Sequence, residues 1–328
     1  MSNFFLVFSN GEKLGDGIIK MPFLHEIKRR FPEFKIIWLA NGTTVYNNKL
    51  KLFADKYIDE VIENAKLNPF FWKKITNKKE LLNLKFEYIF DTQKAVARTI
   101  ALKRLKHNNF ISKSANGLFS SIKIKKKNIQ KKYYLDELID LLDNVRNKDI
   151  DKFFKINIPP SIENILSKYF DPKVKYIGIA PGAGDQDRVW PLQNFIDVAK
   201  HFEKLNFKIV WFIGPNEIKI QSLIKNEFPN SIYPEELITE FSNIEVVMAT
   251  TKFLICCLAN DSGISHVLST KQCSLIKLIG NKNSIKFSPN HEKIINISPN
   301  NFRHDNISNI DIKTVITKIE SIIKNKND

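Results

Sequence analysis

Two glycines enclose a single carboxylate near the start of the chain, at Gly15, Asp16 and Gly17. Helical spacing of apolar residues follows, so Asp16 is predicted to lie in the first turn of a helix. There its carboxylate can cap free backbone N–H groups. Alternatively, it can accept the proton of a substrate hydroxyl group as a general base. The residues alone favour the cap, because this spacing is common.

A second segment, residues 176–191, places two glycines and an arginine after an apolar run. Backbone N–H groups around Gly182 and Gly184, next to the cation of Arg188, would suit a phosphate group. The segment matches neither G-x-G-x-x-G nor G-x-x-x-x-G-K-[ST], so the common nucleotide fingerprints are absent. Arg188 could equally be a surface residue, with Trp190 packing at the start of the next helix.

A third segment contains Asp261, Ser262 and Gly263, with His266 one helical turn further on. Ser262 can cap the new helix and leave its other N–H groups to an anion. Asp261 could then bind sugar hydroxyl groups, and His266 could donate to a phosphate oxygen. The alternative is a capped turn followed by a partly buried histidine, and His266 alone would favour that alternative.

Glu217 follows a further apolar run, in the segment G-P-N-E. A carboxylate at such a position can hold both hydroxyl groups of a ribose, as acidic residues do in dinucleotide sites. It can also simply stabilise the first turn of a helix.

Each of these segments follows a predicted strand, and helical periodicity separates the strands. This alternation predicts an α/β protein with parallel sheets covered by helices. The predicted strands are 4–8, 35–39, 86–90, 176–180, 208–213, 253–258 and 274–279. The predicted helices include 18–31, 192–205 and 311–323, the last capped by Asp311. Loops at the carboxyl ends of such strands face the ligand crevice.

Two consecutive prolines, Pro159 and Pro160, mark the predicted domain boundary, because an extended linker tolerates them. We therefore predict an N-terminal domain at 1–158 and a C-terminal domain at 159–328, each doubly wound and facing the other across a cleft. The final helix, at about 311–324, is a candidate for packing against the N-terminal domain.

The composition is that of an ordinary globular protein, with 43% apolar and 26% charged residues. The longest apolar run, residues 253–259, is far shorter than the roughly 20 residues of a membrane span. No signal peptide is recognisable at the N-terminus. Three cysteines, two of them adjacent at Cys256 and Cys257, make neither a disulfide framework nor a zinc site. A cytoplasmic location is expected.

The basic residues are concentrated in the first half of the chain. Residues 1–158 contain 31 Lys and Arg against 17 Asp and Glu, whereas residues 159–328 contain 20 against 18. A bias of the genome would spread lysine evenly, so this asymmetry indicates a polyanionic partner of the first half. The candidates for contact with that partner are Lys94, Arg98, Lys103 and Arg104.

Several partners would satisfy this charge, namely phospholipid, phosphorylated glycolipid or nucleic acid. The basic stretch 94–132 has few aromatic residues for stacking on bases, Phe110 and Phe119, and no recognisable nucleic-acid module. Nucleic acid is therefore not the expected partner. A solvated surface with accidental clustering of lysine is the remaining alternative.

Taken together, the segments resemble glycosyltransferase family 9, the family of ADP-heptose:lipopolysaccharide heptosyltransferases. The matching stretches are L-G-D at 14–16, P-G-A-G at 181–184, R-V-W-P at 188–191, G-P-N-E at 214–217 and N-D-S-G-x-x-H at 260–266. Weaker similarity runs through F-D-T-Q at 90–93. The resemblance therefore covers nearly the whole chain.

The resemblance implies a GT-B fold with an acceptor-binding N-terminal domain and a donor-binding C-terminal domain. It implies inverting, metal-independent transfer of a heptose or related sugar from an ADP-sugar to an anionic glycolipid such as a lipopolysaccharide core, at the inner face of the inner membrane. Asp16 would then be the catalytic base. The implied donor-binding residues are Gly182, Gly184, Arg188, Glu217, Asp261, Ser262, Gly263 and His266.

The sequence departs from the family pattern at Ser262, where threonine is usual, and at Ile264, where proline is frequent. Serine keeps the hydroxyl group, whereas Ile264 leaves the shape of the loop and the donor sugar open. The alternatives are a GT-B enzyme that uses another nucleotide sugar, such as a UDP-sugar, and a non-catalytic basic binding protein.

Overall fold

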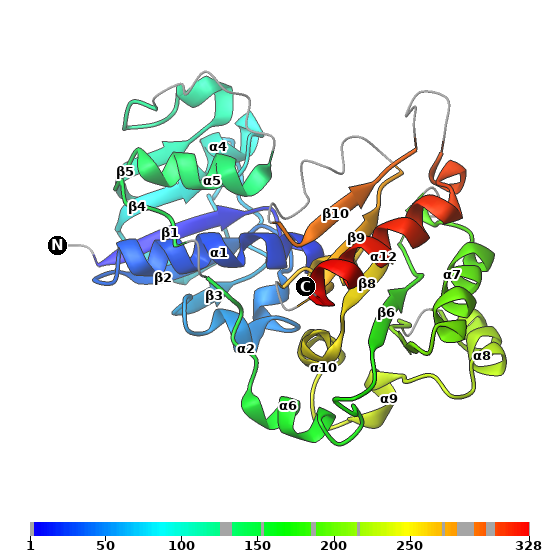
Figure 1. The fold of residues 1–328 in the computed structure, drawn as a ribbon. Coiled ribbons are helices and arrows are strands. Elements are labelled where there is room, and N and C mark those ends of the chain that lie inside the picture. The colour runs from blue at the N-terminus through cyan, green and yellow to red at the C-terminus, as the bar shows by residue number, and fades with distance from the viewer. Residues whose placement is uncertain are drawn as a thin grey trace. The chain divides into compact units, whose positions relative to one another are not determined.

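Every strand that the structure describes belongs to one of two parallel sheets of five strands each (Figure 1). The structure is a computed structural model and describes residues 3–124, 133–151, 154–184, 188–214, 217–270, 273–280, 292–299 and 306–327. The chain divides into unit 1, Met1–Phe154, and unit 2, Lys155–Asp328. Each unit contains one of the sheets.

The sheet of unit 1 has the strand order β3-β2-β1-β4-β5. Its strands are β1 (Phe4–Ser9), β2 (Lys35–Ala40), β3 (Glu60–Ile62), β4 (Phe86–Asp91) and β5 (His107–Ser112). The helices of this unit are α1 (Leu14–Arg30), α2 (Lys51–Ala54), α3 (Lys79–Asn83), α4 (Val96–Lys103) and α5 (Tyr134–Asp143). The predicted strands at 4–8, 35–39 and 86–90 are thus confirmed.

The sheet of unit 2 has the order β10-β9-β8-β6-β7. Its strands are β6 (Tyr176–Ala180), β7 (Lys208–Trp211), β8 (Cys256–Asn260), β9 (Ser274–Leu278) and β10 (Ile294–Ile297). Its helices are α6 (Pro160–Leu166), α7 (Leu192–Lys204), α8 (Ile218–Glu227), α9 (Pro234–Leu237), α10 (Asn243–Thr250), α11 (Gly263–Leu268) and α12 (Ile312–Asn327).

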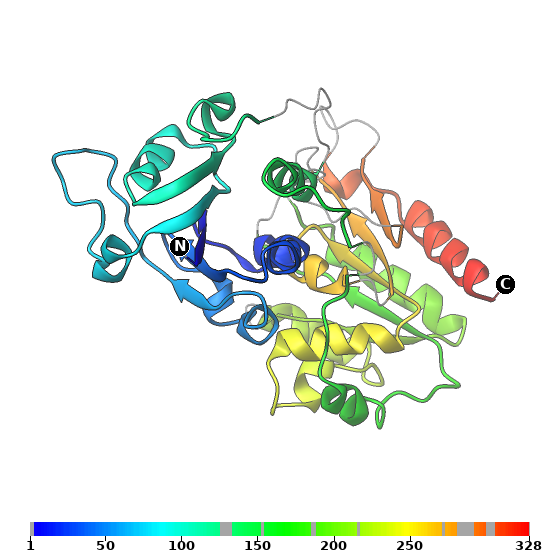
Figure 2. The same ribbon diagram turned by 90° about the vertical axis from the view of Figure 1, so that its left-hand side faces the viewer.

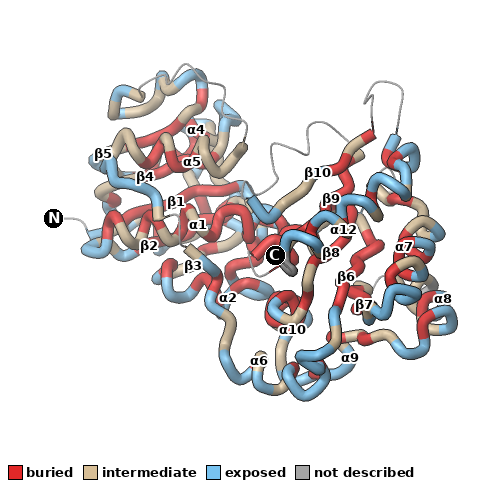
Figure 3. The backbone as a smooth tube through the Cα atoms, in the orientation of Figure 1, coloured by how far each residue is buried: buried red, intermediate tan, exposed pale blue. Residues whose placement is uncertain are grey.

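The strands are nearly continuous apolar runs because helices cover both faces of each parallel sheet. Figure 3 shows the buried strands and the exposed outer faces of the helices. In unit 1, the rings of Phe5, Phe23, Phe31 and Phe90 pack between the sheet and α1. In unit 2, α7 and α12 contribute to one buried cluster with β6, β8 and β9.

The final helix, α12, contributes Val315, Ile319 and Ile322 to the core of unit 2. Asp311 caps its start as predicted, because the Asp311 carboxylate accepts the N–H of Thr314 at 3.1 Å. The apolar face of α12 is therefore used inside unit 2. The packing of this helix on the N-terminal domain stays a prediction.

Among the boundaries that differ from the sequence prediction, two have a clear structural reason. Strand β8 begins at Cys256, three residues later than predicted, because Phe253 ends the short 3₁₀ turn η4 (Thr251–Phe253) and stacks on Phe170 at 4.7 Å. Pro160 is the first residue of α6 and no part of an extended linker. A proline is tolerated there because the first helical N–H has no partner within the helix.

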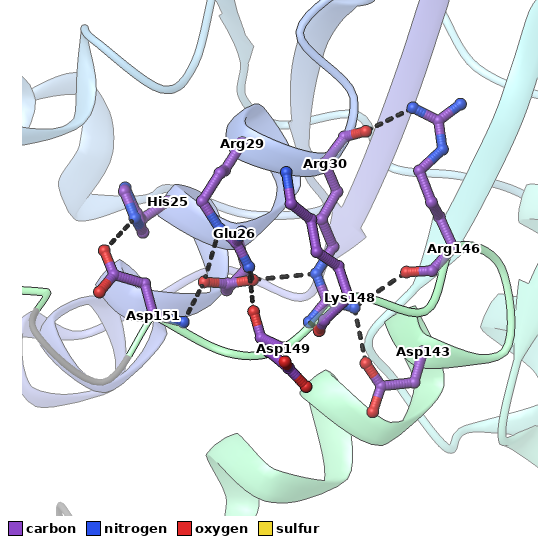
Figure 4. Close-up of polar contacts among 9 residues, drawn as sticks. All are labelled: His25, Glu26, Arg29, Arg30, Asp143, Arg146, Lys148, Asp149 and Asp151. Atoms are coloured by element: carbon purple, nitrogen blue, oxygen red, sulfur yellow. Dashed lines mark hydrogen bonds and ion pairs between the residues drawn. The ribbon is translucent and has the colours of Figure 1, made fainter.

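An ion-pair network fixes the end of α1 to the last part of unit 1 (Figure 4). The buried guanidinium of Arg30 donates to Glu26 at 2.9 Å and to Asp143 at 2.6 Å. It also donates to the carbonyl groups of Arg146 and Lys148, at 3.0 and 2.7 Å. Burial opposes ionisation of Glu26, but the hydrogen bonds from Arg29, the backbone of Asp151 and Arg30 hold its pKa below the usual value.

We predict that Arg30→Met lowers the free energy of unfolding by about 3–5 kcal/mol, because it removes the buried guanidinium that pairs with both Glu26 and Asp143. Lys35→Met is the matched control, since it removes an exposed ion pair with Glu60 and should cost about 0–1 kcal/mol. Urea denaturation of both variants measures the difference. Equal losses of stability would contradict the structural role of Arg30.

Candidate active site

In each sheet the chain first adds strands on one side of its first strand and then returns to add strands on the other side. The loop after the first strand and the loop after its new neighbour therefore lead in opposite directions. The strand orders place β1 beside β4 in unit 1 and β6 beside β8 in unit 2. Open α/β sheets bind ligands at such a point, because the connections on its two sides lead in opposite directions. The predicted site residues follow three of these strands: Asp16 follows β1, Arg188 follows β6 and Asp261 follows β8.

Asp16 lies in the first turn of α1, and its side chain is exposed. No side chain caps the start of this helix, whose N-cap residue is Lys13. The cap that the residues alone favoured is therefore not formed. An exposed carboxylate at this strand end is available to a substrate hydroxyl group.

A buried ion pair lies directly beneath this turn of α1. The Lys20 ammonium donates to Glu12 Oε1 at 2.8 Å, and both side chains are buried. Glu12 Oε2 accepts the indole N–H of Trp38 at 3.2 Å and the hydroxyl group of Thr44 at 2.5 Å. The Glu12 carboxylate thus accepts three side-chain donors, which fixes α1 on β2 and on the segment after it.

The charge of Lys20 is maintained by the carboxylates around it. Burial lowers its pKa, but Glu12 and, to a smaller extent, Asp16 raise it, and the net effect is a pKa above the usual value. Lys20 is therefore a cation one helical turn after Asp16. Gly17 brings this turn close to its support, because a Cβ there would lie 2.4 Å from Val45 Cγ2.

Asp91, in the F-D-T-Q segment, ends β4 and is buried. Its carboxylate accepts the hydroxyl groups of Thr99 and Ser112, at 2.7 and 2.9 Å, and the N–H of Gln93 at 2.9 Å. Burial raises its pKa even though these hydrogen bonds oppose the shift. Asp91 therefore joins β4 to α4 and β5, and its role is structural.

In unit 2, Asn260 joins the two loops at the strand ends. Its amide donates to the carbonyl group of Pro181 at 2.6 Å and accepts the N–H of Trp190 at 3.1 Å. The buried indole of Trp190 donates in turn to the carbonyl group of Ile310 at 3.0 Å. The loop that carries Arg188 is thus attached at both ends to the loop that carries Asp261.

Glu217 lies against the ends of β6 and β7. Glu217 Oε2 accepts the N–H of Gly214 at 3.0 Å. A Cβ on Gly182 would lie 1.5 Å from Glu217 Oε1, so glycine is required there for the carboxylate to fit. Burial raises the pKa of Glu217, and the hydrogen bond from Gly214 opposes the shift. By contrast, Gly184 is exposed, with open space where a Cβ would stand.

Asp261 forms a buried ion pair with a lysine of the neighbouring strand. The Lys277 ammonium lies 2.5 Å from Asp261 Oδ1, and the two residues are only 1% and 6% exposed. Burial lowers the pKa of Lys277, Asp261 raises it, and the nearby guanidinium of Arg188 lowers it again. The net effect is a pKa of Lys277 below its usual value, and Arg188 lies close enough to the Asp261–Lys277 pair to contribute to this shift.

Two buried polar atoms of the Asp261 loop have no hydrogen-bond partner in the structure, namely Ser262 Oγ and His266 Nδ1. As predicted, Ser262 is the N-cap residue of α11, where it forms a capping box with Ser265. Ser265 Oγ accepts the N–H of Ser262 at 3.3 Å and donates to its carbonyl group at 2.8 Å. Burial, together with Lys277, lowers the pKa of His266, so its imidazole is neutral. Buried polar atoms without partners are costly, and a polar ligand would satisfy both.

A cavity of about 160 Å³ opens beside the end of β7. Trp211, Ile213, Gly214, Tyr233 and Glu235 are among its lining residues. The indole nitrogen of Trp211 is buried without a hydrogen-bond partner in the structure. Burial raises the pKa of Glu235 to about 8. The cavity thus offers an apolar wall with polar groups that can orient a ligand.

The four cations predicted to contact an anionic acceptor have different surroundings. Lys94 pairs with Glu137 at 2.8 Å, and Arg98 is half-buried. The exposed Lys103 donates to the carbonyl group of Phe119 at 3.1 Å. The guanidinium of Arg104 donates to four backbone carbonyl groups, so its contacts give it a structural role. Residues 125–132 of the basic stretch lie outside the described residues.

Three features of the site were not predicted from the sequence: Lys277, the Glu12–Lys20 pair and Glu235. A lone lysine in an apolar strand gives no signal of its partner, since only the sheet register brings Lys277 beside Ala259, two residues before Asp261. Within the described residues, no cluster of His, Cys, Asp and Glu side chains could hold a metal ion. No described helix could span a bilayer, since each is too short or too polar.

Comparison with protein families gives one match over more than half of the chain. The model of glycosyltransferase family 9 (heptosyltransferase) matches residues 76–311. Among curated proteins, no sequence has a significant match.

Solved structures match over the whole length. The glycosyl transferase family 9 protein from Veillonella parvula is 17% identical with a TM-score of 0.72, covering 99% of this chain and 98% of that one. Escherichia coli heptosyltransferase WaaC with ADP-2-deoxy-2-fluoro heptose is 14% identical, with a TM-score of 0.68 and coverage of 97% and 99%. Escherichia coli ADP-heptose lps heptosyltransferase II is 13% identical, with a TM-score of 0.67 and coverage of 99% and 100%. The predicted GT-B fold is thereby confirmed.

The raised pKa of Glu235 predicts a pH-dependent stability. In the folded state Glu235 keeps its proton up to about pH 8, whereas the unfolded chain releases it near 4.5. The folded state binds more protons between these values, so its stability falls as the pH rises through this window. Glu235→Gln should therefore raise the melting temperature at about pH 8 and change it little below about pH 4.5.

Differential scanning fluorimetry across this pH range measures the effect. Glu227→Gln is the matched control, because it removes an exposed carboxylate of unit 2 that pairs with Lys200 at 2.5 Å. A difference between Glu235→Gln and the wild type that stays constant with pH would contradict the raised pKa of Glu235.

Proposed function

The chain belongs to glycosyltransferase family 9, the heptosyltransferase family, and from this premise we propose that it transfers a heptose or a related sugar from an ADP-sugar to an anionic glycolipid. The reaction is inverting and metal-independent, and the acceptor resembles a lipopolysaccharide core. Unit 2 binds the donor and unit 1 the acceptor. The observation that supports this proposal most directly is the group of side chains around Asp261. Ser262 Oγ and His266 Nδ1 are buried without a hydrogen-bond partner in the structure, and the basic side chains of Arg188 and Lys277 lie near them.

The donor diphosphate binds beside Arg188 and Lys277. Negative charge builds on the leaving diphosphate as the glycosidic bond breaks, and fixed cations and donors stabilise that charge without reorganising. Ser262 Oγ and His266 Nδ1 donate to its oxygens, which satisfies two groups that are otherwise buried without partners. Asp261 accepts hydrogen bonds from the hydroxyl groups of the sugar.

The nucleoside binds along the ends of β6 and β7. Glu217 holds the ribose diol with its carboxylate, which is fixed by the N–H of Gly214. The base enters the cavity of about 160 Å³ next to Gly214. Glu235 stays protonated up to about pH 8, so it can donate a hydrogen bond to a ring nitrogen of the base. Two solved structures of Escherichia coli WaaC contain ADP-2-deoxy-2-fluoro heptose and ADP.

Asp16 acts as the general base. Its carboxylate takes the proton of the acceptor hydroxyl group while that oxygen forms a bond to the anomeric carbon, on the face opposite the diphosphate. The bond between the anomeric carbon and the phosphate oxygen breaks, and its electron pair leaves with the diphosphate. Lys20 and Glu12 hold the first turn of α1 in position during this step.

The excess of basic residues in residues 1–158 supports an acceptor made of phosphorylated lipid and acidic sugars. Arg98 and Lys103 remain the candidates in α4 for contact with it, together with Lys94. The protein would then work as a peripheral enzyme at the cytoplasmic face of the inner membrane.

We predict that Asp16→Asn lowers the transfer rate at least 1,000-fold, within the range that general-base catalysis contributes, and leaves ADP affinity within about twofold of wild type. Asp55→Asn is the matched control, since Asp55 is an exposed carboxylate of unit 1 that pairs with Lys51. Single-turnover transfer and ADP titration provide the two readouts. Unchanged transfer by Asp16→Asn would remove Asp16 from the mechanism, and no transfer by wild type with any nucleotide sugar would favour a non-catalytic protein.

Titration calorimetry tests the donor. ADP should bind more tightly than UDP, because a purine fills the cavity better than a pyrimidine, and Lys277→Met should weaken ADP binding at least tenfold, or about 1.4 kcal/mol. The double variant Asp261→Asn, Lys277→Met keeps the buried site neutral if the single variant is unstable. Lys200→Met removes an ion-paired lysine of α7 and is the control. Tighter binding of UDP would point to a UDP-sugar donor instead.

A further inference from the structure

Three consecutive aromatic residues are exposed in the loop between β3 and α3. Phe70, Phe71 and Trp72 have 49%, 83% and 64% of their surface exposed. The loop stands away from the strands of unit 1 (Figure 2). Exposing adjacent large apolar side chains is unfavourable in water, and such a patch usually marks an interaction site.

The loop is held in one conformation by Arg104 of the α4 C-cap. The Arg104 guanidinium donates to the carbonyl groups of Asn68, Phe70 and Lys73, at 2.7, 2.6 and 2.7 Å. It also donates to the carbonyl group of Phe71 at 3.3 Å. The aromatic segment therefore has most of its backbone acceptors satisfied within the protein, which reduces the cost of placing it in a medium with little water.

The rings also order one another. Phe70 stacks on Trp72 with centroids 4.9 Å apart, and Phe71 meets Trp72 edge-on at 4.7 Å. Phe70 thus covers one face of the indole, which leaves less of it open for stacking on bases.

Lysines surround this aromatic patch. Residues 65–79 contain five lysines and no acidic residue. Lys73 and Lys74 follow Trp72 directly and are exposed, and the Lys73 ammonium lies 5.8 Å from the ring centre of Phe70. Protein–protein interfaces are depleted of lysine at their core. Aromatic rings beside lysines are instead typical of segments that lie at a membrane surface with anionic lipids.

We propose that residues 70–74 dock the protein on an anionic bilayer. Phe71 and Trp72 enter the headgroup region, and Lys73 and Lys74 pair with lipid phosphate groups. This surface gives a location to the membrane contact of the proposed function, but its binding to lipid needs neither donor nor acceptor, so it can fail while the transfer reaction stands.

Trp72 makes a direct test possible, because the other three tryptophans, Trp38, Trp190 and Trp211, are completely buried. Vesicles of phosphatidylglycerol and phosphatidylethanolamine should shift the tryptophan emission to the blue, and lipids brominated near the headgroup should quench it. Vesicles of phosphatidylcholine alone should produce neither effect. Trp72→Phe should remove both signals and keep the binding.

Sedimentation with the same vesicles measures affinity. Phe71→Ser with Trp72→Ser should weaken binding at least tenfold, and Lys73→Gln with Lys74→Gln should weaken it and reduce its dependence on salt. Leu118→Ser is the matched control, since Leu118 is 79% exposed elsewhere in unit 1 and its replacement should leave binding within twofold.

Three results would overturn the proposal: equal vesicle binding by wild type and the Phe71, Trp72 double variant, a wild-type dimer in sedimentation that this variant loses, or tighter binding of the loop to single-stranded RNA than to vesicles. The first would move the membrane contact elsewhere. The second would assign the patch to a second copy of the chain.

Discussion

In a parallel sheet, two adjacent strands can have connections that lead in opposite directions. A gap then forms between the loops at the carboxyl ends of these two strands. Both sheets of this protein have such a pair of strands, and the polar residues of the proposed site follow the strands at each gap. The Asn260 amide binds both ends of the loop that carries Arg188 and directly precedes Asp261, so the two loops of unit 2 are joined. The order of the strands in each sheet thus determines which residues lie together at its gap.

Buried ion pairs occur at both gaps, Glu12 with Lys20 and Asp261 with Lys277. Such pairs add little net stability, because removing both charges from water costs about as much as their attraction returns. Their presence next to exposed or unpaired polar groups is therefore better explained by function. In unit 1 the pair positions the helix that carries Asp16. In unit 2 it places a cation beside Arg188, where the proposed diphosphate would bind.

The sequence predicted seven strands and the glycine-bearing loops, because continuous apolar runs and turn residues are local signals. It missed β3, β5 and β10, each of which lies at the edge of its sheet. It could not assign the hydrogen bonds of Asp16 and Ser262, since both competing roles use the same side chain at the same helix start. The roles of Lys277 and Arg104 could not be predicted for a different reason. Their partners lie 16 residues or more away along the chain, and only the folded sheet shows that one lysine supports a site and one arginine supports a loop.

In the proposed mechanism, Ser262 Oγ and His266 Nδ1, near Asp261, bind the donor diphosphate. Nitrogen-15 NMR of histidine-labelled protein tests it directly, with the His266 signal assigned by its loss in His266→Gln. Addition of ADP should shift the Nδ1 resonance of His266, because that atom gains a hydrogen-bond partner, whereas adenosine should leave it nearly unchanged. A His266 resonance that ADP saturates without moving would contradict the account.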